Sequence, residues 1–220
     1  MDTLITLSPG DEELCKQLHP EVRCVLVPYI SEYQMSNIEK KDEGTTRIMI
    51  SHSGWIHNNH LKVFDLLKKY KDEDIQIICP LCYGEDEYID QIIKTGIAYF
   101  GEKFTYFKDL KPKEEYEKII KSLHIYITAS PIQTGLYALI TSIVYGAKIF
   151  ITGNLLYSMN SYGFLVHDLQ SIAEMDYSEF STQLTEEQIL YNTKIFKEKY
   201  ANLSVVLNDW KSIYSNRKIG

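Results

Sequence analysis

The sequence predicts an α/β fold, a Rossmann-like parallel sheet with helices on both faces, and three observations support this class. From residue 47 onward, short apolar runs alternate with amphipathic stretches at nearly even spacing, which is the pattern of strands joined by crossover helices. The run Ile48–Ile50 is apolar without alternation, as expected of a parallel strand buried on both faces. Gly146 ends one amphipathic stretch directly before another apolar run, where a helix terminator is expected.

The elements are expected in a regular order along the chain. Strands are predicted at 47–51, 75–79, 103–107, 124–128 and 148–152, and helices at 58–70, 85–95, 112–121 and 134–145. After Gly96, the run 98–100 predicts further extended structure. The pattern loosens beyond Asn154, until Thr185 and Gln188 form a capping box for a helix that reaches about residue 200. A last helix is predicted from 203 to 214.

The first 46 residues contain a strand, helix and strand of their own. We predict strands at 3–7 and 24–27 and, between them, a helix at 11–18 that is capped near Ser8 with Pro9 in its first turn. This arrangement is typical of the last elements of a separate domain. We therefore expect residues 1–35 to be the remnant of a preceding Rossmann domain, 36–46 a polar linker, and 47–220 a nucleotide-sugar-binding domain with C-terminal helices. On this interpretation the chain is the second half of a larger two-domain protein.

Composition excludes several classes of protein. The formal net charge is −7 over 220 residues, which argues against nucleic acid or an anionic membrane as the main partner. The acidic excess lies in residues 1–46, which hold nine Asp and Glu against four Lys and Arg. No apolar run is long enough to span a membrane, and the first residues lack the pattern of a signal peptide. We therefore expect a cytoplasmic protein.

The four cysteines, Cys15, Cys24, Cys79 and Cys82, fit a reducing compartment. Cys79 and Cys82 have the spacing of a redox or zinc pair, but the other two cysteines are not similarly spaced. Cys79 ends a predicted buried strand, where cysteine behaves as a small hydrophobe. The structural interpretation of this pair is therefore favoured.

The segment from Ser51 to His60 is the first candidate phosphate site. An apolar strand runs into a small polar turn and then into an amphipathic helix, so that Ser53 and Gly54 are expected to offer backbone N–H groups to an anion. Capping and turn formation explain the same residues without a ligand. A metal site at His52, His57 and His60 is disfavoured, because no carboxylate or cysteine is nearby.

A second candidate lies at Gln133, Thr134 and Gly135, where the helix after the fourth strand begins. Glycine allows close approach of a phosphate to the backbone, and the Thr134 hydroxyl is a further donor. Because the carboxyl ends of parallel strands meet at one edge of the sheet, both turns should face the same cleft. Simple helix capping remains the alternative.

Several stretches together resemble glycosyltransferase family 56, whose members are labelled 4-alpha-L-fucosyltransferases. They occur in family order, and they are Leu7-Ser-Pro-Gly-Asp-Glu-Glu13, His19-Pro-Glu-Val-Arg23, Ser51-His-Ser-Gly54 with Asn59-His60, Cys79-Pro-Leu-Cys-Tyr-Gly84 and Gln133-Thr-Gly-Leu-Tyr-Ala-Leu139. The resemblance implies the C-terminal, donor-binding domain of a two-Rossmann-domain (GT-B) enzyme. It implies a donor such as dTDP-4-acetamido-4,6-dideoxygalactose and a polyprenyl-diphosphate-linked saccharide as acceptor in surface polysaccharide synthesis. It implies no cofactor and no metal.

The resemblance also assigns roles to individual residues. The diphosphate is expected at the two turns, with His60 aligned with the histidine of the family. From their places at strand ends, and not from the resemblance, Pro80, Tyr83 and Gly84 are candidates for the base and Asn154 for sugar hydroxyls. Packing remains the alternative for Tyr83, and turn formation the alternative for Asn154. Many GT-B enzymes hold the ribose through a glutamate, but the comparable region here offers only Thr141.

No catalytic residue can be named. His167 and Asp168 are adjacent, but such a pair is more often structural. Under the resemblance, a catalytic base and the acceptor site belong to the missing domain, through which the protein would also associate peripherally with the inner face of the bacterial inner membrane. This chain alone is then expected to bind the nucleotide without turnover.

Two other functions remain open from the sequence. One is a non-catalytic, flavodoxin-like binding or interaction module that uses the same sheet edge for a partner. The other is a complete small enzyme whose phosphate loops bind a different phosphorylated ligand.

Overall fold

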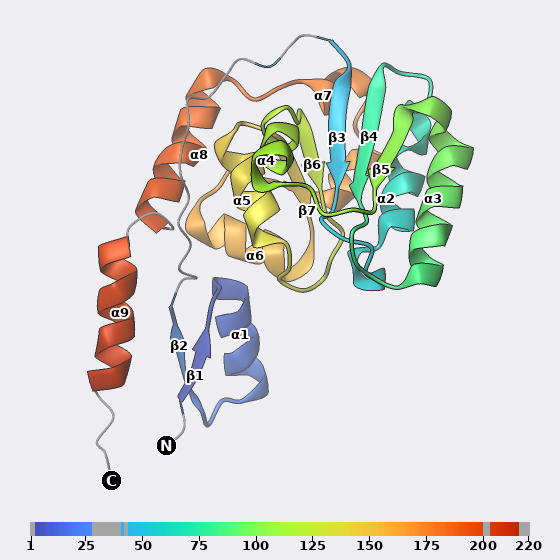
Figure 1. The fold of residues 1–220 in the computed structure, drawn as a ribbon. Helices are drawn as coiled ribbons and strands as arrows, with labels where there is room; N and C mark the ends of the chain where they lie inside the picture. The colour runs from blue at the N-terminus through green and yellow to red at the C-terminus, as the bar shows by residue number, and fades with distance from the viewer. Residues whose placement is uncertain (1–2, 28–40, 42–43, 200–202, 216–220) are drawn as a thin grey trace.

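A six-stranded parallel sheet forms the centre of the molecule, with helices on both faces (Figure 1). The computed structural model describes residues 3–27, 41, 44–199 and 203–215. The strand order is β5-β4-β3-β6-β7-β8. The chain builds one side of the sheet outward from β3 and then returns to place β6 against the other side of β3. This reversal is the topological switch point of a doubly wound fold.

From Thr46 to Ile151 the strands and helices follow the predicted order. The strands are β3 (Thr46–Ile50), β4 (Ile75–Pro80), β5 (Phe104–Phe107), β6 (Ile125–Ile127), β7 (Lys148–Ile151) and β8 (His167–Asp168). The helices between and after them are α2 (His60–Leu67), α3 (Asp86–Phe100), α4 (Lys113–Lys121), α5 (Leu136–Val144), α6 (Gly153–Tyr162), α7 (Tyr177–Ser181), α8 (Glu186–Lys199) and α9 (Leu203–Ser215). The predicted α/β fold with a parallel sheet is confirmed.

Each face of the sheet carries its own apolar core. Side chains alternate along a strand, so Ile48 and Ile50 of β3 pack with Phe64 of α2 and Ile92 of α3 on one face. On the other face, Met49 packs in the cluster that contains residues of α4, α5 and α6. Burial on both faces explains why the central strands are apolar throughout.

Two sequence predictions about helices were wrong. Residues 98–100 belong to α3 and are not extended. Gly96 lies inside this helix because a Cβ there would meet the Phe104 ring at 2.6 Å, so glycine permits close packing of the helix on β5. The helix ends at Gly101 instead, where φ is +57°.

The second difference is α6, which occupies the stretch beyond Asn154 where the sequence pattern loosens. Its buried residues Leu155, Met159 and Tyr162 follow helical spacing. The sequence does not predict this helix, because Gly153 and Asn154 are typical turn residues. His167 and Asp168 form β8, and the Asp168 carboxylate accepts a hydrogen bond from the Gln170 N–H at 2.8 Å. Asp168 thus caps the 3-10 turn that follows, which agrees with a structural role.

A smaller unit precedes the sheet domain and has its own two-stranded parallel sheet, β1 (Thr3–Thr6) and β2 (Arg23–Leu26), joined by α1 (Pro9–Leu18). The predicted cap is present, since Ser8 Oγ accepts from the Asp11 N–H at 3.2 Å. The boundaries of the proposed domains remain predictions, and the proposed linker 36–46 lies largely outside the described residues.

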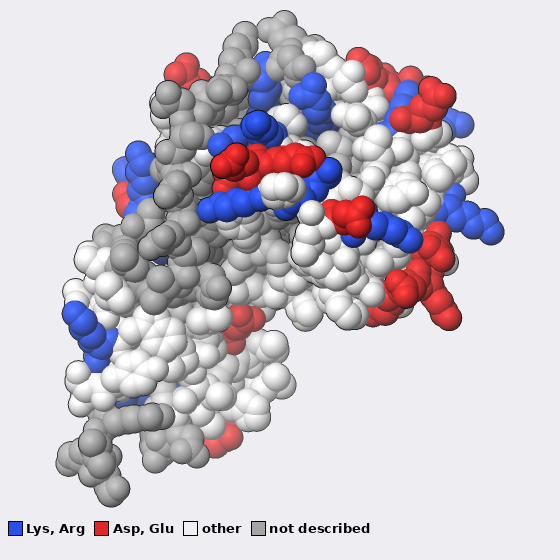
Figure 2. All heavy atoms as spheres, in the orientation of Figure 1, with Lys and Arg blue, Asp and Glu red and all other residues white. Residues whose placement is uncertain are grey.

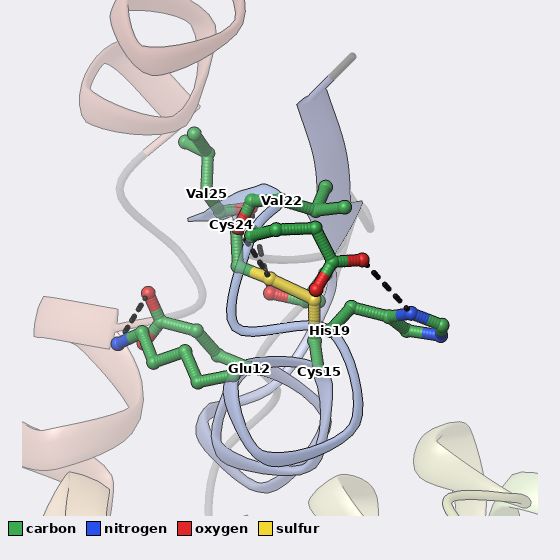
Figure 3. Close-up of a disulfide and its surroundings, with 9 residues drawn as sticks. Glu12, Cys15, His19, Val22, Cys24 and Val25 are labelled. Carbon is green, nitrogen blue, oxygen red and sulfur yellow. Dashed lines mark hydrogen bonds and ion pairs between the residues drawn. A yellow bond between two sulfur atoms is a disulfide. The ribbon is translucent and has the colours of Figure 1, made fainter. Parts of the chain in front are cut away.

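Cys15 and Cys24, which we expected to be thiols of a reducing compartment, form a disulfide (Figure 3). The bond ties α1 to β2 within the small unit. Their sequence separation is only nine residues, and no sequence pattern distinguishes this pair. Cys79 and Cys82 remain free, with Cys79 buried at the end of β4. Burial raises the pKa of the Cys79 thiol, in agreement with its structural role.

Charges of both signs are mixed on the face shown in Figure 2. Over α4, Lys111 lies 2.6 Å from Glu115, and Glu117 lies within 4 Å of both Lys113 and Lys121. On this face, the described residues form no single-sign patch of the kind that attracts nucleic acid. Among the described residues, no helix combines the length and apolarity needed to cross a bilayer.

The capping box of α8 supplies a first test of local structure. The Thr185 N–H donates to Gln188 Oε1 at 2.9 Å, and the Gln188 N–H donates to Thr185 Oγ1 at 3.3 Å. We expect Thr185→Ala to lower the free energy of unfolding by about 1 kcal/mol, because one helix N–H loses its acceptor. Urea denaturation measures this change. Gln183→Ala, at an exposed position outside the box, should change stability by less than about 0.5 kcal/mol, and an equal loss in both variants would contradict the role of the cap.

Candidate functional site

The candidate site lies at the carboxyl ends of β3 and β6, the two strands that flank the switch point. In open α/β sheets this is the place where a crevice forms, because the loops after the two strands diverge to opposite faces. The loop after β3 covers 51–59, and the loop after β6 covers 128–135. In Figure 1 the arrowheads of β3 and β4 point toward the end of the sheet domain that lies nearer the β1–α1–β2 unit.

Side chains join these two loops to each other. Thr134 Oγ1 and His52 Nε2 form a hydrogen bond at 3.0 Å. Asn59 Nδ2 donates to the Ala129 carbonyl at 3.0 Å, and Ser51 Oγ donates to Thr128 Oγ1 at 3.3 Å. The two turns that the sequence predicts separately are therefore parts of one structure.

Gly135 sits directly against the His52 ring. It adopts a left-handed conformation with φ of +65° and is the N-cap of α5. A Cβ at this position would lie 2.4 Å from His52 Nδ1. Glycine is therefore required here for two reasons, the left-handed backbone conformation and the close approach of the His52 ring.

The helix starts around the switch point suit an anion. No acidic residue occurs in the first turn of α2, α5 or α6. The helices that start farther along the same edge differ, since α3 has Asp86 and Glu87 and α4 has Glu114 and Glu115 in the first turn. The unpaired N–H groups of a helix start favour negative charge. The first turn of α5 contains no carboxylate that would repel an anion there.

The Gly54 N–H is not free, and Ser53 serves as an acceptor within its own turn. Both are buried, and Asn58 Nδ2 donates to the Ser53 carbonyl at 2.8 Å and to its hydroxyl at 3.0 Å. The Gly54 N–H donates to the Tyr83 carbonyl at 2.7 Å. A turn of 3-10 helix (Ile56–Asn58) separates these residues from α2. The sequence predicts the helix from residue 58, whereas α2 begins at His60. The contact of Ser53 and Gly54 with a diphosphate stays a prediction.

His60, expected at the diphosphate, is completely buried. Its ring makes an edge contact with Tyr88 at 5.9 Å between centroids. Because it is the first residue of α2 after the 3-10 turn, its side chain points into the core between α2 and α3. Both ring nitrogens are buried and have no hydrogen-bond partner among the described residues, and the expected contact of His60 with a ligand stays a prediction.

Gln133, Thr134 and Gly135 are partly exposed and lie at the loop that leads into α5. Gln133 Oε1 is buried and makes no hydrogen bond within the part of the chain that the structure describes. Of the six residues predicted for the diphosphate, these three remain available at the edge of the sheet.

The residues predicted for the nucleoside and sugar are scattered. Pro80 is buried in β4, where it pairs with Phe107. Tyr83 is 49% exposed at the end of the β4 loop. Gly84 forms a bridge with Gly54. Thr141 is buried inside α5.

Asn154 is engaged elsewhere, because its Nδ2 donates to Asp11 Oδ1 at 2.6 Å. Only Tyr83 of this group presents a side chain that is free to stack on a base.

His52 is the functional candidate that sequence reasoning missed. The sequence suggests it only as a metal ligand with His57 and His60, whereas the structure uses it to join the two loops. Its distance in sequence from Thr134 leaves no local signal. In the described ranges 3–27, 41, 44–199 and 203–215, no group of three or more His, Cys, Asp or Glu side chains could hold a metal ion.

Burial keeps His52 and His60 neutral. Desolvation lowers the pKa of His52 to about 4, with a smaller contribution from His57. Desolvation likewise lowers the pKa of His60 to about 3, and His52 and His57 add to the shift. At neutral pH both rings are therefore uncharged, and His52 interacts with Thr134 as a neutral imidazole.

These low pKa values predict a loss of stability in acid. A histidine in the unfolded chain has its ordinary pKa of about 6.5 and binds a proton below that pH, whereas folded His60 does not, so the free energy of unfolding falls as pH drops from about 6.5 toward 3. Between pH values of about 6.5 and 5, burial of neutral His60 should lower the free energy of unfolding by about 2 kcal/mol. Urea denaturation of wild type and His60→Gln at about pH 7 and pH 5 measures this, and the variant should lose less stability on acidification.

The exposed residue His19 provides a matched control for this experiment. His19→Gln makes the same chemical change at an exposed position outside the core. If His60→Gln loses as much stability over the same pH interval as the wild type does, burial of His60 is not responsible.

Comparison with solved structures supports the fold. A glycosyltransferase from Rickettsia africae matches with a TM-score of 0.73 and 14% identity, over 97% of this chain and 63% of that one. The pneumococcal O-GlcNAc transferase GtfA, solved with UDP and GlcNAc, matches with a TM-score of 0.62 and 14% identity, over 98% of this chain and 45% of that one. WaaG, a glycosyltransferase involved in lipopolysaccharide biosynthesis, matches with a TM-score of 0.62 and 9% identity, over 98% of this chain and 62% of that one.

The fold is therefore that of GT-B glycosyltransferases, and the chain spans about half to two thirds of the length of these structures. No curated protein matches the chain. The family model of 4-alpha-L-fucosyltransferase glycosyl transferase group 56 matches residues 5–158, a range that begins within β1 and includes α1, β2 and both loops of the candidate site. The chain belongs to glycosyltransferase family 56.

Proposed function

We propose that the chain is the donor-binding part of a glycosyltransferase that transfers a deoxy-acetamido sugar, such as 4-acetamido-4,6-dideoxygalactose, from dTDP to a polyprenyl-diphosphate-linked saccharide. The diphosphate binds at the start of α5, against Gln133, Thr134 and Gly135. The exposed Tyr83 ring stacks on the base. The chain supplies no catalytic residue that we can name, and the acceptor binds to a further domain that also provides the contact with the membrane.

One observation carries this proposal, the hydrogen bond that joins His52 to Thr134 across the switch point. It fixes the loops after β3 and β6 relative to each other, so the crevice is formed before a ligand arrives. A preformed site loses less entropy on binding than one that must be ordered. At this position the α5 helix start, which has no acidic residue in its first turn, stabilises the negative charge of a nucleoside diphosphate.

The same arrangement gives a chemical role in transfer. When the glycosidic bond to the sugar breaks, negative charge develops on the diphosphate leaving group. Backbone N–H groups at α5 and the Thr134 hydroxyl are fixed donors that stabilise this charge as it forms. The chain holds the anomeric carbon in place through the diphosphate and the base, while the acceptor is brought to it from the other domain.

Isothermal titration of this chain tests the proposal, with dTDP, UDP and thymidine as ligands. We expect dTDP to bind, and thymidine to bind at least tenfold more weakly (about 1.4 kcal/mol), because it lacks the diphosphate. The ratio of dTDP to UDP affinity reports which base is preferred. Equal affinity for dTDP and thymidine would contradict a diphosphate site at α5.

The main alternative is a non-catalytic, flavodoxin-like interaction module. It predicts that none of the three ligands binds. Transfer of sugar by the isolated chain would instead contradict the claim that the acceptor side lies in another domain.

A further inference from the structure

The stretch Leu7–Glu13 matches the family but has no part in the donor site described above. It forms the beginning of α1 in the small unit. Ser8 Oγ accepts from the Asp11 N–H at 3.2 Å and donates to Asp11 Oδ2 at 2.8 Å. One carboxylate oxygen of Asp11 is thus held within α1, while the other is directed away from it.

This second oxygen contacts the sheet domain. Asn154 Nδ2, in the first turn of α6, donates to Asp11 Oδ1 at 2.6 Å. The Gly10 N–H donates to Ser158 Oγ at 3.0 Å, one turn farther along α6. These two bonds hold α1 against α6, which lie next to each other in Figure 1.

The contact is also close-packed. A Cβ on Gly10 would lie 1.5 Å from Asn154 Oδ1, so only glycine fits there. Farther along, burial raises the pKa of Tyr162 of α6 to about 12, and the carboxylates of Glu12 and Asp11 add to the rise. Both ends of α6 therefore face α1.

The start of α6 in turn touches the loop of the donor site. Gly153 precedes Asn154 and has φ of +60°. A Cβ on Gly153 would lie 3.1 Å from the Pro131 carbonyl oxygen and 3.2 Å from its Cα. Pro131 belongs to the loop 128–135, which carries Gln133, Thr134 and Gly135. A line of contacts thus runs from Asp11 through the first turn of α6 to Pro131, which lies in the loop that leads to α5.

We propose that Asp11 is a positioning residue, which holds Asn154 and thereby couples the placement of the β1–α1–β2 unit to the conformation of the loop 128–135. When α1 is docked, the first turn of α6 is fixed and the loop is held in the conformation that binds the donor. When α1 is released, the loop loses this support. The coupling between the docking of α1 and the conformation of the loop 128–135 does not depend on what the site binds. Only its effect on nucleotide affinity rests on the proposed function.

A charge exchange tests the pair. Asn154→Asp places two carboxylates where the 2.6 Å hydrogen bond stands and should separate the helices, because like charges at this distance repel. Adding Asp11→Asn restores the bond with donor and acceptor reversed, and the amide oxygen introduced at position 11 can still accept from Ser8. The negative charge then lies in the first turn of α6, where the helix dipole again favours it. Asn160→Asp, an exposed position on the same helix, makes the same chemical change without the contact.

Amide hydrogen exchange of the loop 128–135 is the first measurement. We expect exchange to be about tenfold faster in Asn154→Asp than in wild type, and to return to within about twofold in the double variant and in Asn160→Asp. Titration with dTDP should follow the same order, with about a tenfold loss of affinity in Asn154→Asp alone.

The two measurements separate this proposal from the donor function. If wild type does not bind dTDP but loop exchange changes as expected, the donor site is contradicted and the coupling stands. If exchange rises at α1 but not in the loop, the coupling is overturned. It is also overturned if the double variant behaves like Asn154→Asp, because the effect then comes from the changed α6 residue and not from its bond to Asp11.

Discussion

Replacing Gly135 by alanine is expected to reduce the affinity for dTDP by at least about a hundredfold. The new Cβ would lie 2.4 Å from His52 Nδ1, which is closer than real Cβ atoms approach a ring. The left-handed φ of +65° adds about 1 kcal/mol of backbone strain for a residue with a side chain. Since His52 moves or α5 starts differently, the hydrogen bond to Thr134 is lost and the two loops separate. Isothermal titration measures the loss.

A matched control separates the contact from the strain. Gly163, at the end of α6, is also in the left-handed conformation, but a Cβ there would meet nothing closer than 3.7 Å. Gly163→Ala should therefore lose about 1 kcal/mol of stability and keep its affinity for dTDP. If Gly135→Ala binds dTDP as wild type does, the two loops are not the nucleotide site. If both variants lose affinity equally, backbone strain is the cause and not the contact with His52.

The fold could be predicted from the sequence because its signals are local. Apolar runs such as Ile48–Ile50 mark buried strands without reference to the rest of the chain, and the capping box at Thr185 fixes a helix start within four residues. Predictions were wrong where a residue serves a distant partner. Gly96 was expected to end a helix but instead lets α3 approach Phe104, and Gly153 and Asn154 start a helix that packs on Pro131 and α1.

The site was predicted less well for the same physical reason. Sequence reasoning identified the two turns and their common edge, since that follows from parallel strands. It could not show that the Gly54 N–H is occupied by the Tyr83 carbonyl, or that His60 points into the core. Nor could it pair His52 with Thr134, because the bond joins residues 82 positions apart. Which donors are free is a property of tertiary contacts.

The contact between Gly54 and Gly84 gives the largest expected effect on stability. Gly84 has φ of +145°, and a Cβ there would lie 2.2 Å from the backbone carbon of Gly54 and 2.3 Å from its oxygen. Backbone atoms next to β3 cannot move aside without disturbing the hydrogen bond from the Gly54 N–H to the Tyr83 carbonyl. We expect Gly84→Ala to lower the free energy of unfolding by about 4 kcal/mol or more, as measured by urea denaturation.

The reciprocal substitution should be milder, although the two glycines face each other. A Cβ on Gly54 points toward Ile89 Cγ1 at 2.3 Å, and the nearest backbone atom that it meets, the Tyr83 oxygen, is 3.4 Å away. An isoleucine side chain can change rotamer, so Gly54→Ala should cost about 1 to 3 kcal/mol, as for overpacking in a core. Equal losses in the two variants, or a larger loss in Gly54→Ala, would contradict this order. A side chain can repack around a new methyl group, whereas a backbone cannot. A larger loss of stability in Gly84→Ala than in Gly54→Ala would therefore show that the loops after β3 and β4 are joined through their main chains.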